Sequence, residues 1–123
     1  MESEPKKILI IEDEKPLSRA LELKLIHEGF LVETLPNGEG FLPLLEKENF
    51  SLIVCDLIMP KVDGFEVLQI IKEKKIKIPV IILTNLSQPE DEKRVLELGA
   101  AHFLVKSDTP LLTIVEQVKK LAK

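Results

Sequence analysis

Acidic side chains and one lysine stand where short apolar segments of the chain end. Glu12 and Asp13 follow the first apolar segment, Asp56 follows the third, and Lys106 follows the last. Three carboxylates held close together would repel one another, and one pKa would rise unless a cation compensated. A hard divalent ion such as Mg²⁺ prefers carboxylate oxygens, waters and substrate phosphate as ligands. The residue types therefore indicate a magnesium site, with the lysine ammonium as a second positive charge.

These residues suit phosphoryl transfer, which needs a positioned nucleophile and positive charge on the phosphoryl oxygens. Asp56 is the best candidate nucleophile, because a carboxylate can form an acyl phosphate and this one ends an apolar segment. Asp13 would bind the metal ion, and Glu12 would hold a metal-bound water. Thr84, at the end of the fourth apolar segment, and Lys106 would bind phosphoryl oxygens.

Five short apolar segments alternate with longer amphipathic ones, a pattern typical of a doubly wound α/β domain. Strands are expected at residues 8–11, 30–35, 52–55, 80–83 and 102–105. Three of these segments are apolar throughout, as in a parallel sheet that helices cover on both faces. Ligands of such sheets bind beyond the carboxyl ends of the strands, which is where the acids and the lysine stand.

Five helices are expected between and after these strands. The first should begin near Pro16 and end at Gly29. The second, around residues 38–48, should be short or irregular because Pro43 lies inside it. The third has a capping-box pattern, with Asp63 as N-cap and an acid three residues on.

The sequence pattern predicts the fifth helix more clearly than the fourth. Ser87 with Glu90 signals the start of the fourth helix, and Gly99 its end. The fifth follows Pro110 and has an amphipathic stripe at helical spacing. Its members are Leu111, Ile114, Val115, Val118 and Leu121.

The composition is that of a soluble globular chain, with 45% hydrophobic and 31% charged residues among 123. This length favours one domain, residues 1–123. The net charge of −4 argues against a nucleic-acid binder, which needs a basic face. No apolar run approaches the roughly 20 residues that span a bilayer. With one cysteine and no signal-peptide pattern, we expect a cytoplasmic protein that contacts neither nucleic acid nor membrane.

The order and spacing of the motifs resemble receiver domains of response regulators across nearly the whole chain. Each motif is weak alone, but their combination is specific. The matching segments are ILIIEDE at 8–14, DLIMP at 56–60 with Gly64, LT at 83–84, LGA at 98–100 and FLVK at 103–106.

The resemblance implies a flavodoxin-like fold, a parallel sheet in the order 2-1-3-4-5 with five helices. It also implies a role for each matching residue. These are phosphorylation at Asp56, an acid pocket at Glu12 and Asp13, a backbone carbonyl of Ile58 toward Mg²⁺, a switch hydroxyl at Thr84, a switch aromatic at Phe103, and the family's lysine at Lys106.

The resemblance further implies a signalling switch of a two-component phosphorelay rather than an enzyme with turnover. Phosphorylation and dephosphorylation would be self-catalysed on this domain. A histidine kinase or phosphotransfer protein would be the donor. Output would pass to a partner or a dimer through the face made by the fourth helix, fifth strand and fifth helix. We expect a stand-alone regulator, although an excised domain of a longer protein fits as well.

The chain departs from the family pattern at three positions. Ser107 stands where the family usually has proline, often after a cis bond, and a cis bond without proline would cost about 3 kcal/mol. The geometry after Lys106 is therefore left open. Ile58 and Leu86 are apolar at positions where the family tunes the access of water to the phosphoryl group. We expect slow self-dephosphorylation for that reason.

Three other functions compete with the receiver interpretation. An aspartate-nucleophile phosphatase typically has a second carboxylate two residues after the nucleophile, where this chain has Ile58. A flavodoxin-like cofactor binder needs a phosphate loop after the first strand, where residues 12–14 are acidic and would repel phosphate. A degenerate receiver would act only as a protein-interaction module. As an ordinary structural alternative, Asp13 and Glu14 could simply cap the first helix.

Overall fold

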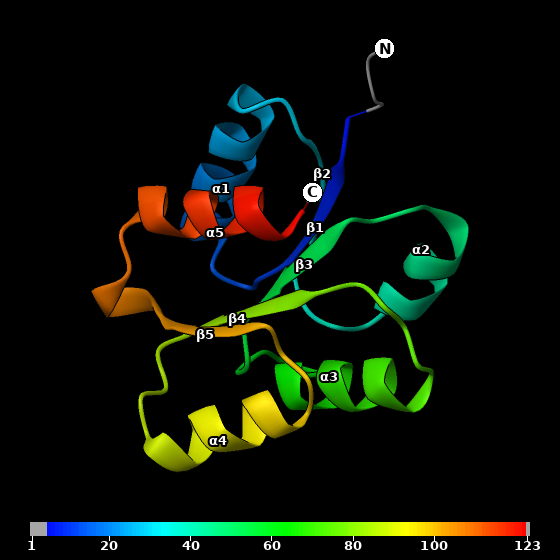
Figure 1. The fold of residues 1–123 in the computed structure, drawn as a ribbon, viewed down its shortest axis with the longest axis vertical. Helices are drawn as coiled ribbons and strands as arrows, with labels where there is room; N and C mark the ends of the chain where they lie inside the picture. Colours follow the sequence, from blue (N-terminus) through cyan, green and yellow to red (C-terminus); the bar gives the residue numbers. More distant parts are fainter. Residues whose placement is uncertain (1–4, 123) are drawn as a thin grey trace.

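The computed structural model describes residues 5–122 and contains one sheet of five parallel strands (Figure 1). The strands are β1 Lys7–Ile11, β2 Leu31–Leu35, β3 Leu52–Cys55, β4 Val80–Thr84 and β5 His102–Val105. Their order is β2-β1-β3-β4-β5, which confirms the predicted order. The third strand is thus central, and β1 lies beside it.

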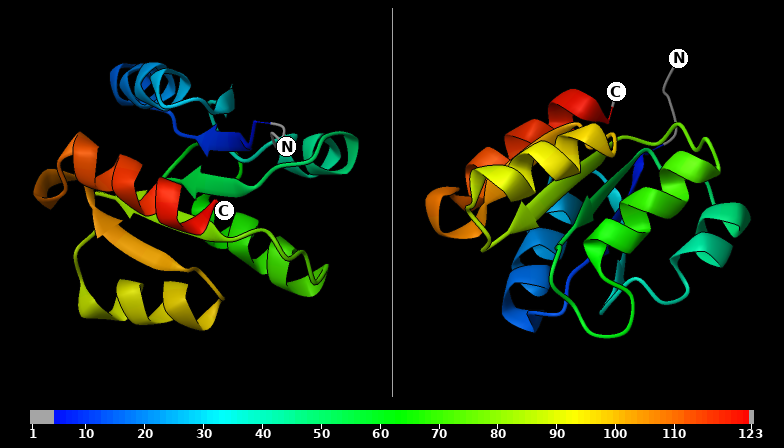
Figure 2. Two further views of the ribbon diagram at one scale, coloured as in Figure 1. Left: turned by 45° about the horizontal axis from the view of Figure 1, so that its top comes forward. Right: turned by 90° about the horizontal axis from the view of Figure 1, so that it is seen from below.

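Helices cover both faces of the sheet, as the apolar strands required (Figures 1 and 2). One core lies between the sheet and helices α1 and α5, and the other between the sheet and α2, α3 and α4. The helices are α1 Lys15–His27, α2 Phe41–Lys47, α3 Gly64–Glu73, α4 Pro89–Glu97 and α5 Leu111–Leu121, with a 3₁₀ turn, η1, at Lys106–Asp108.

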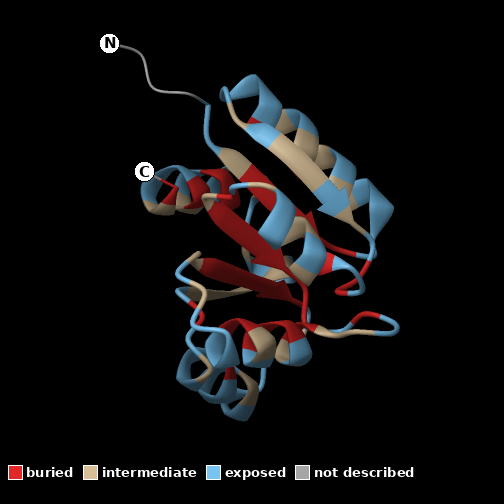
Figure 3. Cartoon of the chain, turned by 90° about the vertical axis from the view of Figure 1, so that its right-hand side faces the viewer, coloured by how far each residue is buried: buried red, intermediate tan, exposed pale blue. Residues whose placement is uncertain are grey.

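The central strands are buried on both sides because alternate side chains enter the two cores. Ile8 and Ile10 of β1 pack toward α1 and α5, whereas Leu9 and Ile11 pack toward the opposite helices. Full burial of such a side chain contributes about 1.5–3 kcal/mol. Figure 3 shows the contrast between these buried strands and the partly exposed edge strand β2. The hydrophobic effect therefore fixes the strands that end at the predicted site.

Local capping signals place most helix ends as predicted. Asp63 caps α3 in a full capping box, with its carboxylate accepting from the Glu66 backbone N–H at 2.9 Å. Gly29 follows α1 at φ +99°, a left-handed conformation that glycine adopts without strain. The predicted short second helix is confirmed, since α2 has seven residues and Pro43 lies in its first turn, where backbone N–H groups have no helical partner anyway.

The prediction that Ser87 signals the start of α4 is wrong by one residue. Gln88 is the N-cap, in an extended conformation, and Pro89 is the first helical residue. Proline favours this first position because its φ suits the helix and its missing N–H costs no bond there. The residue before proline is pushed into an extended conformation, which makes Gln88 the boundary. Within residues 5–122, no helix is long and apolar enough to cross a bilayer.

Candidate functional site

Sheet hydrogen bonds continue one residue past β1 and β3 and bring two acids side by side. The backbone N–H of Glu12 donates to the carbonyl of Leu35 at 2.9 Å. In the same way the N–H of Asp56 donates to the carbonyl of Ile11 at 2.9 Å. Both carboxylates therefore leave the sheet at its carboxyl edge from neighbouring strands.

The three predicted acids gather at this edge. Glu12, Asp13 and Asp56 each offer a carboxylate oxygen, and these oxygens lie within 4.8 Å of one another. Glu12 and Asp56 are only 4% and 5% exposed, whereas Asp13 is exposed. Burial raises the pKa of Glu12 to about 7, although hydrogen bonds from the Glu14 N–H and Lys106 oppose the rise. A cluster of oxygen donors this close fits a hard divalent cation such as Mg²⁺.

The ammonium group of Lys106 contacts three carboxylates of the site. Its Nζ lies 3.0 Å from Glu12, 3.0 Å from Oδ2 of Asp56 and 2.6 Å from Oε1 of Glu14. Burial by itself would lower the pKa of Lys106, but the hydrogen bonds to Glu14, Glu12 and Asp56 outweigh it and raise the pKa well above the ordinary value. The side chain is therefore a permanent ammonium ion at neutral pH.

The backbone after β3 orients the Asp56 carboxylate. Oδ1 accepts from the Leu57 N–H at 2.7 Å and, at 3.4 Å, from the Ile58 N–H. Oδ2 is the oxygen that faces Lys106. The loop itself is held by a bond from the Gly64 N–H to the Leu57 carbonyl at 2.9 Å. Backbone N–H groups thus hold Oδ1 of Asp56, and Oδ2 faces the ammonium group of Lys106.

Thr84 is the last residue of β4, and Phe103 lies in the neighbouring strand β5. Thr84 is 1% exposed, and its hydroxyl oxygen accepts from the Leu86 N–H at 3.2 Å. The hydroxyl proton is then directed elsewhere and can be donated to an anion. Phe103 is half-buried in β5 and packs against the core beneath α3 and α4.

A pocket of about 320 Å³ opens beside these groups. Ile58 and Leu86, the two apolar positions singled out in the sequence, both line it. Asn85 also lines it, and no sequence pattern singled that residue out. The full lining is Asp13, Glu14, Asp56, Ile58, Thr84, Asn85, Leu86 and Lys106.

The chain after Lys106 forms the turn η1, and no peptide bond among the described residues is cis. The Lys106–Ser107 bond is therefore trans. The hydroxyl of Thr109 donates to the Val105 carbonyl at 2.7 Å and closes the turn. Ser107 is accommodated in this way at the position where the family usually has proline.

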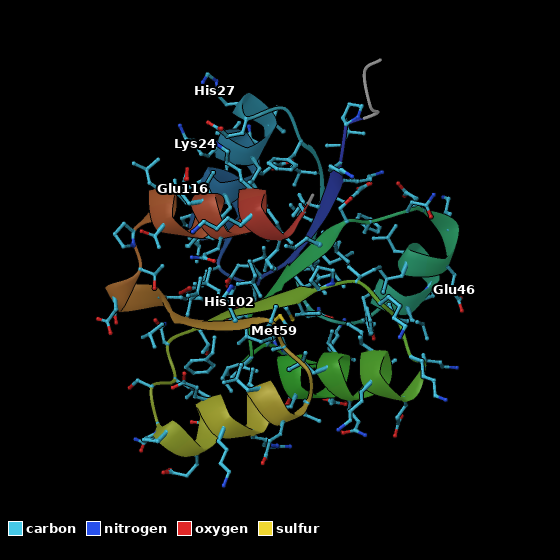
Figure 4. The ribbon with its side chains drawn as sticks, viewed as in Figure 1. Lys24, His27, Glu46, Met59, His102 and Glu116 are labelled. Atoms are coloured by element: carbon cyan, nitrogen blue, oxygen red, sulfur yellow. The ribbon has the colours of Figure 1, made fainter. Side chains whose placement is uncertain are left out.

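The cysteine and the histidines take no part in this cluster. Cys55 is buried, its thiol donates to the Asp56 carbonyl at 3.1 Å, and burial raises its pKa well above the ordinary value. It packs as a small apolar residue. His27 lies at the end of α1, far out on the molecule (Figure 4), and His102 opens β5, at the sheet edge opposite the acids.

The chain is similar to known proteins over most of its length. The family model of the response regulator receiver domain matches residues 8–116. A probable transcriptional regulator, ycf27 of Porphyra purpurea, is 41% identical over 110 residues, which cover 89% of this chain and 45% of that protein. The alkaline phosphatase synthesis transcriptional regulatory protein PhoP of Bacillus subtilis (strain 168) is 36% identical over 105 residues, covering 85% and 44%. The chain thus spans under half the length of these relatives.

Solved structures match nearly the whole chain. The receiver domain of the Francisella response regulator 1452 superposes with a TM-score of 0.88 at 28% identity, covering 95% of this chain and 96% of that one. The response regulator TrrA of Thermotoga maritima, solved in complex with Mg²⁺ and beryllofluoride, superposes with a TM-score of 0.81 at 33% identity, covering 94% and 98%.

Proposed function

The chain belongs to the response regulator receiver domain family, and on that basis we propose that it is a phosphoacceptor switch of two-component signalling. Asp56 would be the acceptor. The observation that carries the proposal is the position of its Oδ2, 3.0 Å from Lys106, in an acidic cluster with Glu12 and Asp13. The donor would be a phosphohistidine of a kinase or phosphotransfer protein, and the switch would act in the cytoplasm.

In the proposed step, Oδ2 of Asp56 attacks the phosphorus atom of phosphohistidine. The P–N bond breaks, the imidazole leaves and takes up a proton, and an acyl phosphate forms. Lys106 and the Thr84 hydroxyl would bind phosphoryl oxygens, while the Leu57 N–H keeps Oδ1 in place. Asp13, Asp56 and the Ile58 carbonyl would bind Mg²⁺ directly, and Glu12 would bind it through a metal-bound water. The bound ion would neutralise the carboxylates and the developing charge.

Output would follow from movement of Thr84 toward the phosphoryl group and of Phe103 inward, which would change the α4-β5-α5 face. We propose that this face binds a protein partner or a second copy. The relatives are named as transcriptional regulators, so the comparisons do not support the prediction that the protein has no contact with nucleic acid. The chain spans less than half the length of these relatives.

The direct test is incubation with acetyl phosphate and Mg²⁺, followed by intact-mass and peptide mass spectrometry. We expect one acid-stable, base-labile phosphoryl adduct on the peptide that contains Asp56. A phosphatase would instead release phosphate from a small phosphoester in excess over protein. Turnover of that kind, or absence of any adduct, would contradict the proposal.

Magnesium affinity should rise with pH up to about 7. The pKa of Glu12 is raised from 4.5 to about 7, so below that pH a cation must displace its proton. Kd should fall about tenfold per pH unit below the pKa and level off above it. Without metal, stability should change with pH in the opposite direction. Between pH 4.5 and about 7 the Glu12 carboxyl binds more protons in the folded state than in the unfolded state. This group therefore lowers the free energy of unfolding as pH rises through that window.

Isothermal titration calorimetry with MgCl₂ across this pH range would check the prediction. Glu12→Gln removes the titrating carboxyl with little change in shape and should flatten the profile. A slope that survives in Glu12→Gln would assign the pH dependence to a different group.

Slow loss of phosphate is expected because Ile58 and Leu86 present apolar side chains to the pocket. Ile58 is 57% exposed, so a polar replacement there costs little packing. We expect the Ile58→Asn, Leu86→Glu double variant to hydrolyse about tenfold faster, by admitting and orienting water, which corresponds to about 1.4 kcal/mol of barrier. Phosphate release after removal of the donor measures the rate. A wild-type lifetime of seconds would contradict the prediction.

A further inference from the structure

We propose that Glu14 is a positioning and specificity-determining residue that holds Lys106 in the unphosphorylated protein and disfavours small anionic phosphodonors. The inference rests on the proposed function of Asp56 and adds a control element to that site. Glu14 is not one of the acids predicted to bind metal. Its role follows from its contact with the ammonium group that the phosphoryl oxygens would need.

The contact between Glu14 and Lys106 is the shortest that the ammonium makes. The distance from Nζ to Oε1 of Glu14 is 2.6 Å, against 3.0 Å to Glu12 and to Asp56. A charge-assisted bond of this length is among the strong ones. The Lys106 side chain is 9% exposed, so the pair is partly shielded from water on the lysine side.

Glu14 differs from the other two acids in its freedom to leave. Its side chain is 49% exposed, whereas those of Glu12 and Asp56 are 3% and 6% exposed. Its backbone is nonetheless anchored, because its N–H donates to Oε2 of Glu12 at 3.0 Å. The carboxylate can therefore rotate into solvent while its attachment point stays beside the site.

Helix capping does not account for this side chain. Glu14 occupies the N-cap position of α1, yet its carboxylate makes no capping hydrogen bond to the helix. The partner it does have is Lys106, 92 residues further along the chain. The sequence left open that Glu14 only caps the first helix. The structure shows another arrangement, because the Glu14 carboxylate is bonded to Lys106 and not to the helix.

A phosphodonor must compete with Glu14 for Lys106. Among the described residues that line the pocket, Lys106 is the one basic side chain, and Glu14 lines it too. A dianion such as acetyl phosphate meets this additional carboxylate and brings little binding energy of its own. A protein donor can offset the lost contact with energy from its wider interface. Glu14 would therefore favour protein donors over small ones.

The test compares wild type with Glu14→Gln, which removes the charge and keeps the shape. The second-order rate constant for phosphorylation by acetyl phosphate should rise about 3- to 10-fold at low salt, and the gain should shrink at about 1 M salt, where charges are screened. Phosphoramidate, which carries less negative charge, should show a smaller gain. Glu14→Asp keeps the charge and shortens the reach, so its rate should fall between the two.

Glu46→Gln is the matched control, because Glu46 is exposed and points outward from α2 (Figure 4), and the change in net charge is the same. Its rates should equal those of wild type. Equal rates for Glu14→Gln and wild type with both donors would overturn this inference while leaving phosphorylation of Asp56 intact. Labelling of neither protein by either donor would overturn both proposals. A gain that is equal for Glu46→Gln would assign the effect to net charge and also overturn the inference.

Discussion

Asp56→Asn is expected to abolish covalent phosphorylation by acetyl phosphate in the presence of Mg²⁺. The amide keeps the size of the side chain, and its oxygen can still accept from the Leu57 N–H, which bonds Oδ1 at 2.7 Å. It lacks the nucleophilic oxygen that faces Lys106 at 3.0 Å. Loss of a nucleophile typically costs about 10⁴-fold or more in rate, so the adduct should fall to background. Intact-mass spectrometry over a time course measures it.

The variant should remain folded, which makes the loss interpretable. Lys106 keeps Glu12 and Glu14 as partners when Asp56 is neutralised. Removal of one of the clustered carboxylates also relieves repulsion among those that remain. Asp108→Asn is a suitable control, since Asp108 is exposed in η1 and should be labelled as wild type is. An adduct that persists in Asp56→Asn would identify another acid, Asp13 first, as the acceptor.

Gly64→Ala is expected to lower the free energy of unfolding by about 3 kcal/mol, the upper end of the cost of overpacking. A Cβ at Gly64 would lie 2.3 Å from the Asp56 carbonyl oxygen and 2.8 Å from the Leu57 Cα. Both are backbone atoms, so no side chain can rotate away to make room. The β3–α3 loop would have to move, taking with it the bond from the Gly64 N–H to the Leu57 carbonyl.

The same movement should disturb chemistry, because the Leu57 N–H orients Asp56. Urea unfolding gives the stability, and labelling by acetyl phosphate gives the rate. Gly29→Ala is the control for conformation alone. Gly29 has φ +99°, and a Cβ there would meet no atom within 4 Å apart from those of its chain neighbours. It should cost about 1–2 kcal/mol and leave labelling unchanged. A loss below about 1 kcal/mol in Gly64→Ala would show that the loop relaxes freely, contrary to the packing argument.

The pattern of residues along the chain was enough to predict the strands and most helix ends. A segment that is apolar throughout, such as 52–55, predicts a strand with both faces buried. This prediction needs only the residues of the segment itself. The Asp63 capping box and Gly29 are local signals too, and both were confirmed. The Ser87 signal is local too, but residue type alone does not place this helix start. Pro89 restricts Gln88 to an extended conformation, which makes Gln88 the N-cap.

The sequence by itself determined which residue types end the strands, and therefore which chemistry is available at the carboxyl edge. The order of the strands did not follow from periodicity and came from the resemblance to a family. Distances across the edge depend on that order, on the register of β1 against β3 and on the path of η1. Only the tertiary structure could therefore bring Glu14 to Lys106, because a contact between residues so far apart in sequence leaves no periodic trace in either segment.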